Sequence, residues 1–212
     1  MEHSILNMER WRHSAVTTQT STFIFGGQSQ RTYEYLPKDS TTWLLGETEI
    51  PDGFEDGCVI ASKSEEEIWL IGGLWNEKRI LNFNVNDHTF HEMHFQLNVG
   101  RFGHRCAFIP NSNKIMITGG YDLDSTEILD TETGSVTMAA PMSYKRSDHG
   151  MSVVTMNCDD RLTFFGAHYG VTDLASLELY NTQTDEWENT SIRLEKPKHG
   201  FGYLSVKLSD II

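Results

Sequence analysis

Histidine is the residue type in this chain whose spacing most readily suggests chemistry. Four of the nine histidines recur at the same place in successive segments: His13, His104, His149 and His199. Imidazole nitrogens are common ligands of transition metals, so a ring of histidines at the mouth of a channel would suit a metal ion. The same recurrence is expected when each histidine fills a structural place in a repeat, and we favour this interpretation. We therefore predict no metal site and no cofactor.

Two other groups of polar side chains do not form a ligand set or an active site. His88, His91 and His94 lie three residues apart, and an interval of three on a β-strand sends side chains to opposite faces. The acidic run 65–67 fits a solvated hairpin turn. The sequence contains no serine–histidine–acid order, phosphate-binding loop or paired-histidine zinc helix. We therefore predict that the chain is not an enzyme.

A glycine pair that follows an apolar run sets the period of the chain. The pairs are Gly26-Gly27, Gly72-Gly73 and Gly119-Gly120, and in a fourth copy Gly166 is followed by Ala167. The first glycines lie 46, 47 and 47 residues apart (26 to 72, 72 to 119, 119 to 166). Short apolar strands and polar turns around each pair predict four strands, A to D, joined by hairpins. Four strands that repeat at roughly 40 to 50 residues are typical of a β-propeller blade.

Besides the glycine pair, a pair of large side chains recurs on the predicted strands C and D. Its four versions are Tyr35 and Trp43, Phe83 and Phe90, Leu129 and Val136, and Tyr180 and Trp187. A glycine pair, then Tyr and Trp, with Arg and His ahead of the next strand, resembles the kelch repeat. The resemblance covers almost the whole chain, and the complete set occurs in the first unit. It implies an all-β, kelch-type propeller of about four four-stranded blades, with partial blades at both ends.

The repeat marks have simple physical roles. Glycine allows the chain to leave strand B with a backbone conformation closed to other residues, and it lets a neighbouring backbone approach. Large aromatic side chains bury wide apolar areas between adjacent blades. The residues predicted to act in this way are Gly26, Gly27, Gly72, Gly73, Gly119, Gly120, Gly166, Tyr35, Trp43, Tyr180 and Trp187.

We expect residues 1–212 to form a single propeller region. The predicted repeats are 10–53, 54–100, 101–145 and 146–197, with partial-blade strands in 1–9 and 198–212. Two interpretations of the ends stay open: the chain is a slice of a larger propeller, which we favour, or its terminal strands close the ring in one shared blade. A slice would expose unpaired strand edges through which the chain self-associates.

The loops between strands predict where a partner binds. B–C loops and D–A loops emerge on the same face of a propeller, and long loops on a rigid scaffold often carry function. In kelch proteins this face commonly binds a peptide, and the resemblance implies a protein-interaction module, such as an adaptor. Aromatic and arginine side chains usually dominate binding energy. The candidate partner-binding residues are Arg31, Trp75, Asn76, Arg79, Tyr121, Asp122, His168 and Tyr169.

Arg101 and Arg146 precede strand A in their repeats and match the arginine of the family. For these two side chains we predict a structural hydrogen bond to a nearby loop. Two alternative functions remain open: an oxidase-like kelch enzyme or metal-binding protein, and an actin-associated kelch protein.

Composition narrows the classes of partner. The formal net charge of −13, from 30 acidic and 17 basic residues, disfavours nucleic acids and anionic membranes, which bind through Lys and Arg. No apolar run approaches the length of a membrane span, and residues 1–8 lack the apolar core of a signal peptide. We therefore expect a cytoplasmic protein, with a nuclear location as the alternative, whose partner is a protein or peptide of unknown identity.

Overall fold

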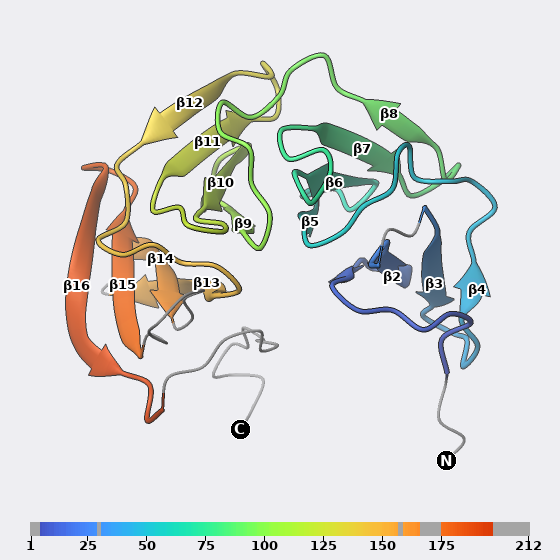
Figure 1. The fold of residues 1–212 in the computed structure, drawn as a ribbon, viewed down its shortest axis with the longest axis horizontal. Coiled ribbons are helices and arrows are strands. Elements are labelled where there is room, and N and C mark those ends of the chain that lie inside the picture. Colours follow the sequence, from blue (N-terminus) through green and yellow to red (C-terminus); the bar gives the residue numbers. More distant parts are fainter. Residues whose placement is uncertain (1–4, 29–30, 157–158, 166–174, 197–212) are drawn as a thin grey trace. The chain divides into compact units, whose positions relative to one another are not determined.

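The computed structural model describes the backbone of residues 5–28, 31–156, 159–165 and 175–196. Within these ranges the regular structure is entirely β, and sixteen strands form four antiparallel, four-stranded sheets. In each sheet the strands follow one another in chain order, so each sheet is a simple meander (Figure 1). The prediction of an all-β chain built from four-stranded units is confirmed.

Each sheet lies inside one predicted repeat. The first sheet contains β1 (Ser14–Thr17), β2 (Ser21–Phe25), β3 (Tyr33–Pro37) and β4 (Leu44–Leu45). The second contains β5 (Cys58–Ala61), β6 (Glu67–Ile71), β7 (Ile80–Asn84) and β8 (Phe90–Glu92). The third contains β9 (Arg105–Phe108), β10 (Lys114–Thr118), β11 (Thr126–Asp130) and β12 (Val136–Ala139). The fourth contains β13 (Gly150–Met156), β14 (Asp159–Phe165), β15 (Ser176–Asn181) and β16 (Glu186–Arg193).

The chain divides into two compact units, Met1–Phe102 and Gly103–Ile212. The first unit holds the first and second sheets, and the second unit holds the third and fourth. The boundary falls between the second and third sheets, two residues inside the third predicted repeat. Within each unit, the A strands of the two sheets are neighbours: β1 contacts β5, and β13 contacts β9.

An aromatic layer joins the two sheets of the first unit. Phe23 and Phe25 of β2 and Tyr33 of β3 are fully buried. All three rings pack against Phe83 of β7, with centroid distances of 5.5, 5.2 and 5.1 Å. Each such ring removes from water an apolar area that contributes about 1.5–3 kcal/mol to folding. The repeated aromatic residues of strands B and C thus form the core between these sheets.

The core of the second unit contains the tyrosine–tryptophan pair of the fourth repeat. Tyr180 of β15 is buried and lies opposite Trp187 of β16, with a ring centroid distance of 5.0 Å. The Trp187 indole N–H donates to the carbonyl of Ala140 at 2.7 Å, just after β12. Trp187 therefore ties the fourth sheet to the exit of the third sheet.

The first repeat places its tryptophan differently. In the second, third and fourth sheets, the recurring side chains of strands C and D lie directly opposite each other. In the first sheet Tyr35 lies opposite Leu44, and Trp43 comes one residue before β4. The longer turn of this repeat accounts for the shift, since Tyr35 and Trp43 are one residue further apart in sequence than the later pairs.

Two of the recurring glycines show why this residue type is required. Gly26 and Gly119 have φ angles of +61° and +62°, in the left-handed region. A Cβ atom added at Gly26 would overlap the carbonyl oxygen of Phe54, and one added at Gly119 would overlap that of Arg146. Both the backbone conformation and the close approach of a neighbouring loop therefore demand glycine here.

Candidate partner-binding surface

The B–C loop of each of the first three sheets is hydrogen-bonded to the D–A loop that follows the same sheet. Backbone N–H groups of the D–A loop donate to carbonyls of the B–C loop in three equivalent pairs: Ile50 to Arg31 (2.6 Å), Leu97 to Lys78 (2.9 Å) and Met142 to Asp124 (2.9 Å). The three donor residues are buried. In the reverse direction, Gly27 donates to Phe54 (2.7 Å), Gly73 to Arg101 (2.8 Å) and Gly120 to Arg146 (2.9 Å). The two kinds of loop therefore form one braced surface after each of these sheets.

Buried ion pairs reinforce the same loops. Arg10 Nε lies 3.0 Å from Glu34, Arg146 Nε lies 2.8 Å from Glu178, and all four side chains are fully buried. Burial alone would raise the pKa of Glu34, but hydrogen bonds from Asn7 and Arg10 lower it below its ordinary value. Arg146 thus makes a structural contact with strand β15, where a contact with a loop was predicted, and its side chain lies away from solvent. Arg101 is fully buried as well.

The second repeat replaces this ion pair with apolar residues. Phe54 occupies the position before β5 that Arg146 occupies before β13. The two positions are equivalent because the backbone carbonyl at each accepts the N–H of the second glycine of the preceding repeat. Leu81 of β7 occupies the register position of Glu34 and Glu178 on strand C. Phe54 and Leu81 are buried members of one hydrophobic cluster. The repeat therefore tolerates either a complete ion pair or a complete apolar pair at these two positions.

Trp75 is the most exposed aromatic residue of the described chain. Its side chain lies on the B–C loop of the second sheet with an exposed fraction of 78%, and its φ angle is +74°. The third repeat has Asp122 at the same distance from its glycine pair, with a φ angle of +59°. Asp adopts the left-handed conformation readily, whereas a bulky residue there costs roughly 1–2 kcal/mol. The loop therefore holds a large apolar ring in solvent at a conformational cost.

Contacts within the first unit connect Trp75 to a second exposed tryptophan. The N–H of Leu74 donates to the carbonyl of Glu55 at 2.8 Å, and the Glu55 carboxylate lies 3.4 Å from the guanidinium of Arg12. That guanidinium lies 4.8 Å from the ring centroid of Trp11, whose exposed fraction is 51%. We call Trp11, Arg12 and Trp75, together with the buried Glu55 that links their loops, the tryptophan surface.

The second unit carries a smaller aromatic surface on equivalent loops. Tyr121 and Tyr144 have exposed fractions of 44% and 46%. Lys145 and Asp122 form an exposed ion pair at 2.9 Å, and the N–H of Arg146 donates to the carbonyl of Leu123. The B–C loop after β10 and the D–A loop before β13 thus present two tyrosines on one hydrogen-bonded framework.

The remaining predicted residues differ in their surroundings. Arg31 is exposed and lies 3.2 Å from Glu49, and Asn76 is partly buried. Arg79 is buried and donates to the carbonyls of Pro51 and Gly53, both at 2.6 Å, so it holds the D–A loop in place. His168, Tyr169 and the repeat glycine Gly166 lie outside the described residues.

Sequence reasoning missed Trp11 and Tyr144. Both precede strand A on a D–A loop and lie next to a basic residue in the sequence: Trp11 beside Arg12, and Tyr144 beside Lys145. An aromatic residue beside a basic one, close to the repeat arginine, is the signal that would have identified them. The prediction concentrated on B–C loops and passed over these positions.

The recurring histidines have unlike environments. His13 is exposed, whereas His104 and His149 are fully buried, and His199 lies outside the described residues. His149 Nε2 lies 3.0 Å from Thr118 Oγ1. Among the described residues, no group of three or more His, Cys, Asp or Glu side chains is arranged to hold a metal ion.

Acid should destabilise the folded chain through His149. Burial, together with the charges of Arg105 and Arg146, lowers the pKa of His149 well below its ordinary value of 6.5. Below about pH 6.5 the unfolded chain therefore binds a proton at this residue that the folded chain does not bind. The stabilisation is complete above that pH and is lost as the pH falls, by about 1.4 kcal/mol per pH unit.

Urea unfolding between about pH 7 and pH 5 measures this loss. His149→Gln should reduce the pH dependence of the unfolding free energy by close to one proton. His13 and His88, whose pKa values are also lowered by burial, titrate in both proteins and cancel in the comparison. An equal pH dependence in the two proteins would show that His149 does not stay neutral in the folded state.

Comparison with known proteins assigns no function to this surface. No model of a known protein family matches the chain, and no curated protein matches it. In the part of the chain that the structure describes, no helix has the length and apolar character needed to cross a membrane. The function must therefore be inferred from the geometry of the loops.

Proposed function

We propose that the chain is part of a kelch-type β-propeller and works as a non-catalytic protein-interaction module. It binds a partner peptide or protein on the surface formed by its B–C and D–A loops. The regular spacing of the glycine pairs, the four meander sheets and the recurring loop–loop hydrogen bonds support this proposal. The tryptophan surface is the centre of binding in the first unit.

The solvent exposure of Trp75 on a braced loop is the observation that carries the proposal. Exposed indole rings on rigid supports are typical of the few residues that dominate binding energy at protein interfaces. The hydrogen bond from Leu74 to Glu55 and the braced loops below it fix the backbone on which Trp75 sits. A conformational cost without any folding benefit is expected when a residue is kept for binding.

Trp75→Asp should weaken partner binding strongly without destabilising the fold. Short peptides selected from a displayed library for binding to the native chain provide the probe. We expect their affinity to fall at least about tenfold in the variant, because a central aromatic contact is lost. The unfolding free energy should stay unchanged or rise by up to about 1 kcal/mol, since Asp suits the left-handed conformation. Fluorescence polarisation and urea unfolding measure the two effects.

Leu44→Asp is the matched control. Leu44 is an exposed apolar residue on β4, with an exposed fraction of 41%, and it lies on the outer strand, away from the loops. The control should retain full affinity for the selected peptides. Equal affinity of the native chain and Trp75→Asp for every selected peptide would refute the assignment of this surface.

A further inference from the structure

The outer strand of the fourth sheet is much longer than those of the other sheets. β16 has 8 residues, whereas β4, β8 and β12 have 2, 3 and 4. An outer strand presents a row of unpaired N–H and C=O groups, and proteins commonly keep such edges short to prevent pairing with other chains. Among the described strands, β16 pairs with β15 alone. The fourth sheet thus has an edge long enough for another strand.

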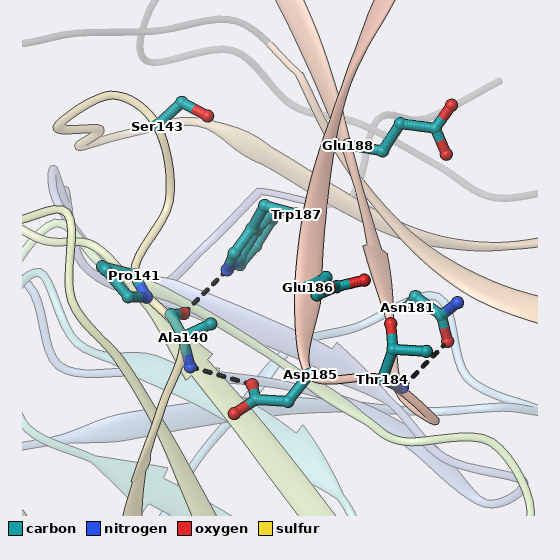
Figure 2. A pocket seen from close by; sticks show the side chains of 9 residues that line it. All are labelled: Ala140, Pro141, Ser143, Asn181, Thr184, Asp185, Glu186, Trp187 and Glu188. Atoms are coloured by element: carbon teal, nitrogen blue, oxygen red, sulfur yellow. Dashed lines mark hydrogen bonds between the residues drawn. The ribbon is translucent and has the colours of Figure 1, made fainter.

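A pocket of about 560 Å³ lies beside the first residues of β16. Figure 2 shows Glu186 and Glu188 on one side of β16 and Trp187 on the other, as the period of two requires. The pocket lies at the β15–β16 hairpin, because Asn181 of β15 and Thr184 of the turn line it together with residues of β16 and of the loop after β12. The lining residues are Ala140, Pro141, Ser143, Asn181, Thr184, Asp185, Glu186, Trp187 and Glu188.

Hydrogen bonds hold the wall of this pocket in place. The Ala140 N–H donates to the Asp185 carboxylate at 2.8 Å, and the Ala140 carbonyl accepts the indole N–H of Trp187 at 2.7 Å. The side chain of Asn189 donates to the hydroxyl of Ser143 at 2.9 Å. The loop after β12 is therefore fixed against β16, and the hollow is formed before any ligand arrives.

The negative charge along β16 favours a basic partner segment. Asp185, Glu186 and Glu188 are all exposed, and the residues that line the pocket include no Lys or Arg. Opposite charges on directly facing strands stabilise their pairing, and like charges destabilise it. A strand that carries Lys or Arg at alternate positions is therefore favoured opposite Glu186 and Glu188.

We propose that β16 accepts an extended basic segment of a partner protein as a fifth strand of the sheet. Backbone hydrogen bonds to β16 hold the segment, its cationic side chains face Glu186 and Glu188, and an intervening side chain enters the hollow beside Pro141 and Trp187. Strand addition of this kind draws affinity from the main chain and specificity from pockets for alternate side chains. The site is separate from the tryptophan surface and does not depend on it.

Binding of a synthetic peptide of alternating Lys and Val tests this site in the full chain. Two further peptides carry N-methyl groups on alternate residues, one in each of the two possible registers. Strand addition requires the N–H groups of one register alone, so one methylated peptide should bind at least about tenfold more weakly and the other should bind like the parent. Hydrogen exchange of the β16 amides that face away from β15 should slow when the parent peptide binds.

Matched charge variants complete the test. Glu186→Gln with Glu188→Gln should weaken binding several-fold, whereas Glu66→Gln with Glu67→Gln, at the start of β6 in the second sheet, should not. Equal binding of both methylated peptides would show attraction by charge without strand pairing and would overturn the proposal. Slow exchange, before any peptide is added, of the β16 amides that face away from β15 would overturn it as well, whether residues 197–212 or a second copy caused it.

Discussion

Arg146→Met should lower the unfolding free energy of the second unit by about 3–5 kcal/mol, because it leaves a buried carboxylate without its counter-ion. Glu178 is fully buried, and its carboxylate accepts hydrogen bonds from Arg146 Nε and from the Ser143 N–H, both at 2.8 Å. After the substitution, the Ser143 N–H is the one remaining donor among these contacts. Urea unfolding of the variant and the native chain gives the difference.

Replacement of both partners should be far less harmful than replacement of one. Arg146→Met with Glu178→Leu removes the charge and its counter-ion together, and the second repeat already carries Phe54 and Leu81 at these positions. We expect the double variant to regain at least half of the loss. The lost hydrogen bond to the Ser143 N–H prevents a complete recovery.

Lys145→Met is the control for the loss of a positive charge. Lys145 is adjacent to Arg146 in sequence and pairs with Asp122 in solvent, so this variant should cost less than about 1 kcal/mol. A double variant whose cost equals the sum of the two single variants would contradict the assignment of Arg146 and Glu178 as a coupled buried pair.

Gly26→Ala should be the most damaging change to the first unit, with a cost of about 4 kcal/mol or more. Its φ angle of +61° alone costs a residue with a side chain roughly 1–2 kcal/mol. The added Cβ would also overlap the carbonyl of Phe54, which accepts the N–H of Gly27 and belongs to a buried residue. The D–A loop would have to move away from the B–C loop and expose part of the core.

Gly103→Ala separates the two contributions. Gly103 has a similar φ angle of +64°, but the nearest atom to an added Cβ, the Cβ of Ser147, lies 3.4 Å away, at ordinary contact distance. This variant should cost roughly 1–2 kcal/mol, the conformational penalty alone. Thermal or urea unfolding of the two variants gives the comparison. A similar cost for both would mean that the close approach of Phe54 to Gly26 contributes nothing.

The four sheets followed from the sequence because their signals are local. A glycine pair ends strand B in the first three repeats, and side chains alternate with a period of two, so hairpins of different length preserve the inward-facing residues. Strand B gives a second local signal. The buried residues of β6 and β10 are consecutive in the sequence because strand B is covered on both faces. Sequence spacing was therefore enough to locate sheets of the right strand number.

The ion pairs and the connection between Trp11 and Trp75 lay beyond sequence reasoning. Arg10 and Glu34 are 24 residues apart, whereas Arg146 and Glu178 are 32 apart, because the intervening turns differ in length. No fixed spacing marks these pairs. Trp11 and Trp75 are brought to one surface by contacts through Arg12 and Glu55, which depend on how loops from two sheets meet.

Fluorine NMR of the peptide complex tests the proposed binding surface most directly. The chain has five tryptophans, so protein labelled with 5-fluorotryptophan gives one signal for each, assigned by single substitutions. We expect a selected peptide to shift the signals of Trp11 and Trp75 and to leave those of Trp69 and Trp187 in place. An unchanged Trp75 signal at saturating peptide, with shifts elsewhere, would contradict the assignment of partner binding to the tryptophan surface.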